Sequence, residues 1–229
     1  MRKFTVGILL IAFYFNSFSQ DKEWQNRNYV GFHIGKSVSK INLIYNDPSI
    51  FLNLEDPYLS SVNFGLSFKN FSEKLGILNI GISADVNYLK NGGYLNFNLN
   101  TDLESTGNVL VKYVPTYIEL NPLVDLSFGR RRLHISLLGG PHFSFLIDEE
   151  INLITQTNGT YKTKADNSFL FGMDLGAGVD FELKKSSLEI RFMYGLGFTD
   201  IFTPEEIDTN LWNNQNRTTS LMLFYYYKL

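Results

Sequence analysis

The sequence contains no cysteine among its 229 residues. Disulfide bonds, thiolate metal sites and lipid attachment through an N-terminal cysteine are therefore excluded. Basic residues are also outnumbered by acidic ones: the chain has 20 Lys and Arg and 23 Asp and Glu, which gives a formal charge of −3. A nucleic-acid-binding domain normally carries a basic patch, so we expect no nucleic-acid partner.

Long apolar runs are absent after the first twenty residues. A transmembrane helix needs about 18 or more such residues in a row. Residues 1–19 instead have the pattern of a secretory signal peptide: Arg2 and Lys3 are followed by an apolar run and by the small-x-small segment Ser17-Phe18-Ser19. We expect cleavage before Gln20, a mature domain over 20–229, and any later membrane contact to be made without helices.

The mature chain is instead dominated by alternating apolar and polar residues. In Ser61-Val62-Asn63-Phe64-Gly65-Leu66-Ser67-Phe68, every even position is apolar and every odd position is polar or glycine. Successive side chains of a strand lie on opposite faces, so the segment predicts a strand with one apolar face and one polar face. The pattern recurs in eight stretches, at about 29–38, 59–69, 76–89, 114–128, 133–146, 169–183, 188–198 and 218–229.

The connections between these stretches alternate between long and short. The short ones are 70–75, 129–132 and 184–187, and the long ones are about 39–58, 90–113, 147–168 and 199–217. Transmembrane barrels have short periplasmic turns, long outer loops and an even number of strands. The fold class predicted is all-β: an eight-stranded antiparallel up-and-down transmembrane β-barrel in the cell outer membrane.

Three features predict that the apolar face points outward to lipid. It carries more bulky side chains than an eight-stranded lumen can hold, and it bears no charge on the second to eighth strands. The opposite face is rich in small residues such as Gly81, Gly176 and Gly195. Aromatic residues near the strand ends are typical of the two interfacial girdles of such barrels.

Three residues fit this arrangement less well. Lys36 falls on the apolar side of the first strand, which suggests that this strand is short or bulged near Gly35. Pro122 and Pro141 lie within strands, where each removes a hydrogen bond of the ladder. A local bulge or a water could absorb that loss.

The lumen is expected to hold a network of paired charges, since charges in a narrow interior must be paired or hydrated. If the turns 184–187 and 129–132 are four-residue loops, Leu183 faces Leu188 and Phe128 faces Leu133. That register predicts an Asp180–Arg191 ion pair and a Glu119–His142 pair. The predicted network comprises Asp180, Arg191, Glu119, His142, Asp125, Asp174 and Asp85.

A carboxylate–histidine pair can act as a catalytic base. No nucleophile lies in register with Glu119 and His142, however, and His33, His134 and His142 lack the spacing of metal ligands. We therefore expect a structural polar network, with no catalytic residues, no metal site, no cofactor and no enzyme activity.

Four segments resemble the PorT-like outer-membrane β-barrel family of Bacteroidetes. They are Tyr117-Ile-Glu119-Leu-Asn-Pro122, Gly139-Gly-Pro141-His-Phe-Ser-Phe145, Gly176-Ala-Gly178-Val-Asp-Phe181 and Leu188-Glu-Ile-Arg191-Phe-Met-Tyr194-Gly-Leu-Gly-Phe-Thr-Asp-Ile201. The family usually has Tyr-x-Glu-x-Pro in the first segment, and the extra Asn121 here favours a bulge. The chain ends in Leu229 where many outer-membrane barrels end in Phe. The resemblance implies a small barrel, and the family's name comes from a component of type IX secretion.

The leading functional hypothesis is a non-enzymatic outer-membrane barrel with a filled lumen and four long extracellular loops, serving structural, surface-interaction or secretion-accessory roles. Expected partners are outer-membrane lipid, the barrel-assembly machinery during insertion and other envelope proteins, with the chain itself a monomer. Two alternatives remain open at this point: a narrow cation-preferring channel, and a soluble exported barrel that binds a ligand. An outer-membrane lipid enzyme or protease is a further possibility, for which the sequence offers no convincing set of catalytic residues.

Overall fold

The computed structural model describes residues 27–45, 58–75, 78–99, 107–130, 132–154, 159–161, 168–199 and 211–229. The expected signal peptide at 1–19 and the expected cleavage site before Gln20 lie outside these ranges. Within them, no helix is long and apolar enough to cross a membrane.

Ten antiparallel strands make up the described structure. They are β1 (Arg27–Tyr45), β2 (Leu59–Leu75), β3 (Leu78–Lys90), β4 (Gly93–Leu99), β5 (Gly107–Arg130), β6 (Leu133–Ile154), β7 (Gly159–Tyr161), β8 (Phe169–Glu182), β9 (Ser186–Gly197) and β10 (Leu211–Lys228).

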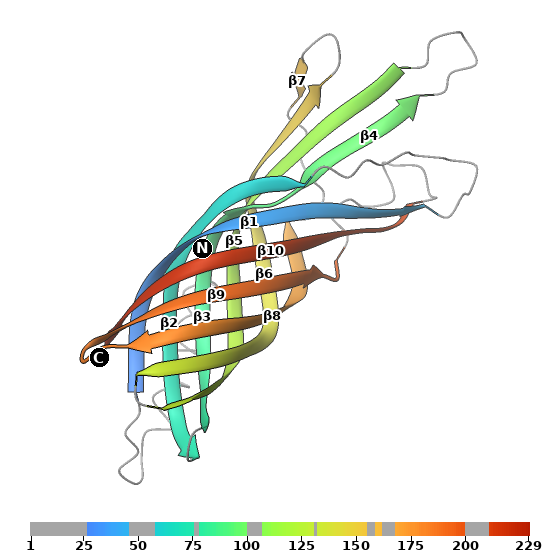
Figure 1. The fold of residues 1–229 in the computed structure, drawn as a ribbon. Helices are drawn as coiled ribbons and strands as arrows, with labels where there is room; N and C mark the ends of the chain where they lie inside the picture. Colours follow the sequence, from blue (N-terminus) through green and yellow to red (C-terminus); the bar gives the residue numbers. More distant parts are fainter. Residues whose placement is uncertain are drawn as a thin grey trace, which may run out of the picture.

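Eight of these strands form a closed ring. The order around it is β1, β2, β3, β5, β6, β8, β9 and β10, and β10 pairs with β1 to close the wall (Figure 1). Closure gives every strand of the ring two neighbours and removes the free sheet edges that lipid cannot solvate. The predicted fold, an all-β antiparallel barrel of eight strands, is confirmed.

Two expected loops contain additional strands. β4 pairs with the first part of β5, and β7 pairs with the last part of β6, so segments within 90–113 and 147–168 continue the sheet instead of forming loops throughout. In Figure 1 these strands extend beyond the barrel on its long-connection side. The signal was present in Gly93-Tyr94-Leu95-Asn96-Phe97-Asn98-Leu99, which alternates like the barrel strands but is shorter.

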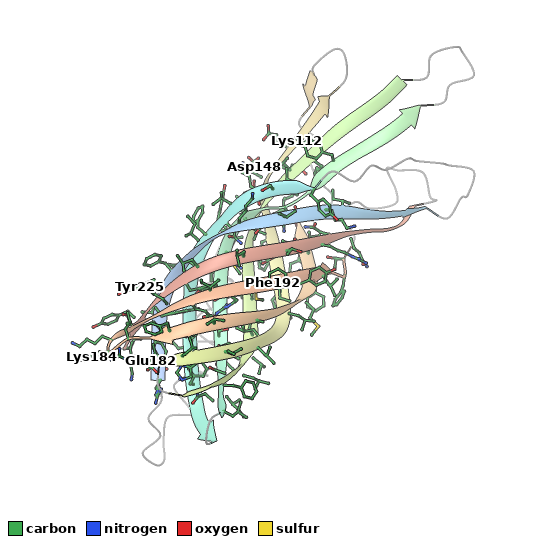
Figure 2. The ribbon with its side chains drawn as sticks, in the orientation of Figure 1. Lys112, Asp148, Glu182, Lys184, Phe192 and Tyr225 are labelled. Atoms are coloured by element: carbon green, nitrogen blue, oxygen red, sulfur yellow. The ribbon has the colours of Figure 1, made fainter. Side chains whose placement is uncertain are left out.

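The apolar face points outward, as predicted. On β2, Phe64 and Leu66 are 51% and 66% exposed, whereas Asn63 and Ser67 are 4% and 3% exposed. Figure 2 shows the labelled side chains of Phe192 and Tyr225 on the outer surface of the wall. Exposed large hydrophobic side chains lie on all eight strands of the ring, as expected for a lipid-facing band.

Aromatic rings gather on the outer surface toward the long-connection end. A chain of aromatic contacts runs over β6, β8 and the residue that follows β9, with ring centroids 5.4–6.4 Å apart: Phe143, Phe145, Phe169, Phe171 and Phe198. Phe64 and Tyr88 stack at 5.0 Å on β2 and β3. Girdles of aromatic residues of this kind flank the apolar band of transmembrane barrels.

The predicted irregularity near Gly35 is wrong. The ladders from β1 to β2 and to β10 both run through Gly35 and Lys36 without a shift of register. Lys36 faces outward between Val62 and Leu221, which are 61% and 58% exposed. A lysine can occupy this place because its flexible stem lets the ammonium reach the polar interface.

The two strand prolines lie opposite each other. Leu120 pairs with Phe143 and Val124 pairs with Gly139, so the unchanged register sets Pro122 against Pro141. The ladder is interrupted over 121–123 and 140–142, as expected where two facing residues both lack an amide hydrogen. The bulge expected near Pro122 is therefore absent, and the irregularity of this ladder falls at Thr116 and Tyr117 instead.

Candidate functional site

The lumen holds the polar residues that the sequence singled out. All seven predicted network members point inward and are at most 9% exposed: Asp85, Glu119, Asp125, His142, Asp174, Asp180 and Arg191. They come from β3, β5, β6, β8 and β9, because inward positions alternate with outward ones along each strand. The structure arranges them in two clusters at different heights in the barrel.

The first group, here called the ion cluster, consists of Lys69, Asp85, Asp125, Asp180, Glu189 and Arg191, and lies toward the short-turn end. Arg191 is 0% exposed. Its Nε donates to Glu189 Oε1 at 2.8 Å and its Nη2 to Glu189 Oε2 at 3.1 Å, while Nη1 donates to Asp85 Oδ2 at 2.6 Å. Planar bidentate contacts of this kind are among the strongest that arginine makes with a carboxylate.

Lys69 is the second cation of the ion cluster and is 1% exposed. Its Nζ donates to Glu189 and lies 3.4 Å from Asp125 Oδ2 and 3.8 Å from Asp180 Oδ2. Four carboxylates thus surround two cations, and Ser187 donates a further hydrogen bond to Asp180. Glu189 joins the cluster together, because it contacts both cations.

Aromatic side chains of β10 complete this layer. Phe224 and Tyr226 are fully buried and stack with ring centroids 5.6 Å apart. The Arg191 guanidinium lies 4.0 Å from the Phe224 ring centroid, and its Nη2 donates to the Tyr226 hydroxyl at 3.0 Å. Together with the ion cluster, these rings occupy the short-turn half of the lumen.

The sequence analysis missed this aromatic contribution. Phe224 and Tyr226 lie on the face that is polar in the other strands and belong to an interior group with Tyr29, Leu123, Leu138, Met193 and Met222. The available signal was the unbroken run Phe224-Tyr-Tyr-Tyr227, which has no polar face. The predicted network also did not include Lys69.

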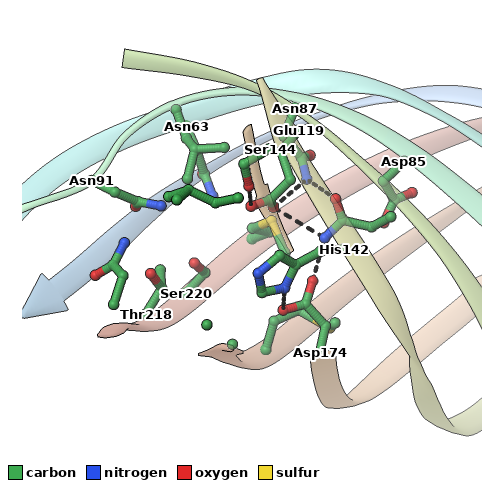
Figure 3. Close-up of a pocket in the computed structure, with 18 of the residues that line it drawn as sticks. Asn63, Asp85, Asn87, Asn91, Glu119, His142, Ser144, Asp174, Thr218 and Ser220 are labelled. Carbon is green, nitrogen blue, oxygen red and sulfur yellow. Dashed lines mark hydrogen bonds and ion pairs between the residues drawn. The ribbon is translucent and has the colours of Figure 1, made fainter. Parts of the chain in front are cut away.

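The second group, here called the carboxylate–histidine cluster, lies toward the long-connection end and consists of Asn87, Glu119, Asn121, His142, Ser144 and Asp174 (Figure 3). His142 Nδ1 lies 2.8 Å from Asp174 Oδ1, and Asn121 Nδ2 donates to Asp174 and, at 3.1 Å, to Glu119 Oε1. Ser144 Oγ donates to Glu119 Oε2 at 2.8 Å. The cluster is a continuous chain of hydrogen bonds from β3 to β8.

The two predicted cross-strand pairs are wrong by two residues. Asp180 lies opposite Glu189, and Arg191 lies opposite Gly178. The turn is shorter than assumed, because the Leu183 amide donates to the Ser186 carbonyl and leaves only two residues between them.

The same shift occurs at the other turn, where Arg130 pairs with Leu133, so that Glu119 faces Ser144 and not His142. A shift by two residues leaves each side chain on its original face. The predicted members therefore still lie in the lumen, although with different partners.

The fold and the lumen together define a class: a closed eight-stranded barrel with an apolar exterior and a polar interior, the architecture of a transmembrane barrel. Residues 18–203 match the family described as outer membrane protein beta-barrel domain. The chain belongs to this family, and the protein is an outer-membrane protein. Comparison with curated protein sequences gave no match.

Several solved structures align with most of the chain at low identity. The attachment invasion locus protein Ail of Yersinia pestis is 10% identical, covers 88% of this chain and 99% of its own, and gives a TM-score of 0.41. OprG of Pseudomonas aeruginosa is 13% identical, covers 89% and 95%, and gives 0.43. The outer membrane protease OmpT of Escherichia coli is 6% identical, covers 92% and 99%, and gives 0.41.

Proposed function

We propose that this protein is a non-enzymatic outer-membrane scaffold. Its filled lumen keeps the wall rigid, and its long-connection end is the working surface for structural, surface-interaction or secretion-accessory roles. The observation that carries the proposal is the ion cluster with its aromatic neighbours. Side chains from β2, β3, β5, β8, β9 and β10 meet there and occupy the short-turn half of the lumen.

The geometry of the carboxylate–histidine cluster supports a structural role over catalysis. Ser144 donates its hydroxyl hydrogen to Glu119, and His142 is held by Asp174. A serine nucleophile would instead need its hydroxyl in contact with the histidine base. The hydrogen bonds of Ser144 and His142 join β6 to its neighbours β5 and β8.

The PorT-like resemblance in the strand segments around Glu119, Pro141 and Arg191 favours a secretion-accessory role within the wider family. We propose that the chain is exported by its residues 1–19, inserted by the barrel-assembly machinery, and embedded in outer-membrane lipid as a monomer that meets other envelope proteins and no nucleic acid. N-terminal sequencing of the protein purified from outer membranes tests the export step, with Gln20 as the expected first residue.

The test of the scaffold proposal is electrical. In planar lipid bilayers, the folded protein should give no steady conductance, because the ion cluster leaves no continuous water path. Folding of the same sample is checked by its heat-modifiable migration on a gel. Steady conductance of folded protein would overturn the filled-lumen proposal.

A narrow cation-preferring channel is the second candidate. It is favoured by the excess of lumenal acids, since six carboxylates share the interior with Lys69 and Arg191: Asp85, Glu119, Asp125, Asp174, Asp180 and Glu189. A channel of this kind would conduct cations over anions and would lose its conductance in the Asp174→Asn or Asp180→Asn variant. Unchanged conductance in both variants would exclude this mechanism.

A further inference from the structure

A cavity lies in the long-connection half of the lumen, above the ion cluster. Its volume is about 40 Å³, counted as the space that the centres of water molecules can occupy. The carboxylate–histidine cluster borders it on one side, and β9 and β10 border it on the other (Figure 3). One water needs roughly 10–15 Å³ on this measure. The cavity therefore accommodates about three waters, or a small polar group with a short apolar stem.

Glycine residues create this space. A Cβ atom at Gly195 would lie 2.8 Å from Asp174 Oδ1, and Gly197 lines the same wall. The absence of side chains at these two positions of β9 leaves room in front of the carboxylate–histidine cluster.

The cavity wall presents buried oxygen atoms without hydrogen-bond partners. Among the described lining residues, every buried side-chain polar atom that lacks a partner is an acceptor oxygen, and each residue is at most 8% exposed: Asn63, Asp85, Asn87, Asn91 and Asn216. Leaving such a group unpaired costs about 1–3 kcal/mol. The wall therefore requires an occupant that donates hydrogen bonds.

The orientation of the Asn87 amide is fixed by its nitrogen. Asn87 Nδ2 donates to Asn121 Oδ1 at 3.2 Å and to Glu119 Oε1 at 3.4 Å. Exchanging its oxygen and nitrogen would place acceptor atoms against each other, so the Asn87 oxygen remains directed away from these partners.

The charge of the wall is also unbalanced. Glu119 and Asp174 line the cavity, and their hydrogen-bond donors are neutral amides, a serine hydroxyl and His142. Arg191 is committed to Glu189 and Asp85, and Lys69 to Glu189, Asp125 and Asp180. Water could satisfy the free acceptors, whereas a cation would satisfy them and also add positive charge beside the carboxylates.

We propose that this cavity binds a primary ammonium group, such as the end of an aliphatic diamine. An ammonium has three N–H donors and no acceptor, which matches a wall whose free atoms are all acceptors. A metal ion is a poorer match, because no group of three or more His, Asp or Glu side chains among the described residues has the geometry to hold one.

The test is a titration of the full-length mature barrel, folded in lipid nanodiscs, with 1,4-diaminobutane and, separately, with 1,4-butanediol. Calorimetry or amide NMR shifts should show saturable binding of the diamine and at least about tenfold weaker binding of the diol. Absence of saturable diamine binding to the folded protein, or equal binding of the neutral diol, would overturn the proposal.

Two variants locate the site. Asn63→Leu and Asn216→Leu each remove one free acceptor and should weaken diamine binding by about tenfold or more, since hydrogen bonds to charged groups are strong. Ser136→Ala is the matched control: Ser136 Oγ is also buried and unpaired but does not line the cavity. Binding that all three variants leave unchanged, in samples with heat-modifiable migration, would contradict the assignment.

Discussion

Arg191 on β9 donates a hydrogen bond from Nη1 to Asp85 Oδ2 on β3, across the lumen, at 2.6 Å. The two strands are not neighbours in the wall. This contact therefore joins opposite sides of the barrel, which the hydrogen bonds between adjacent strands do not do. Its removal should affect the stability of the whole ring.

The Arg191→Leu variant should lower the free energy of unfolding by about 3–5 kcal/mol, because Asp85 and Glu189 would lose their shared cation while remaining buried. The measurement is reversible denaturant unfolding in lipid vesicles, followed by gel migration. Arg132→Leu, at an exposed turn position, is the control and should change the value by no more than about 0.5 kcal/mol. Similar losses in both variants would refute the role given to the ion cluster.

The lipid-facing band predicts a dependence on depth. Leu175 lies near the middle of β8 and is 47% exposed, whereas Leu183 lies at the short turn and is 37% exposed. Leu175→Arg should cost about 2–4 kcal/mol and Leu183→Arg about 0–1 kcal/mol, because only the former places the charge near the midplane. Equal costs, measured by unfolding in vesicles, would mean that the band does not span the bilayer as described.

Gly172 predicts a steric limit inside the barrel. A Cβ atom there would lie 2.2 Å from the Leu196 carbonyl oxygen and 2.3 Å from His142 Nε2, whereas one at Gly139 would meet its nearest neighbour, Leu175 Cδ2, at 3.2 Å. We expect Gly172→Ala to destabilise the barrel by about 1–3 kcal/mol. Gly139→Ala should be milder, because a leucine methyl can move more easily than a backbone carbonyl. The reverse order of stability would contradict this packing.

The facing prolines predict a repairable gap in the wall. Pro122→Ala supplies an amide hydrogen opposite the carbonyl of Pro141, and the new bond should stabilise the barrel by about 1 kcal/mol. Hydrogen exchange followed by NMR should show the new amide protected, with the exposed-turn amide of Lys184 as the fast-exchanging reference. Rapid exchange at position 122 would show that the two strands do not approach each other as described.

Strict alternation on β2, β3 and β8 was sufficient to divide the residues between the two faces of the wall, because the face depends only on whether a residue is even or odd along its strand. The alternating connection lengths then predicted the barrel, and the bulk and lack of charge of the apolar face, together with the small residues opposite, predicted that it points outward. Register depends on turn length, which composition does not determine, and the two-residue turn at Lys184 and Lys185 shifted every pair between β8 and β9. The contact between Arg191 and Asp85 also could not be predicted from the sequence, because it crosses the ring between strands that are distant in sequence.

The ion cluster also has consequences for the order in which the barrel assembles. Lys69 on β2 finds its carboxylate partners on β5, β8 and β9, all of which follow it in the chain. An early hairpin facing acyl chains alone would carry an ammonium group without counter-charge, which hydrocarbon strongly disfavours. The first strands must therefore stay sheltered from the membrane interior until the last ones are added, so that the neutralising contacts form in the same event that closes the wall.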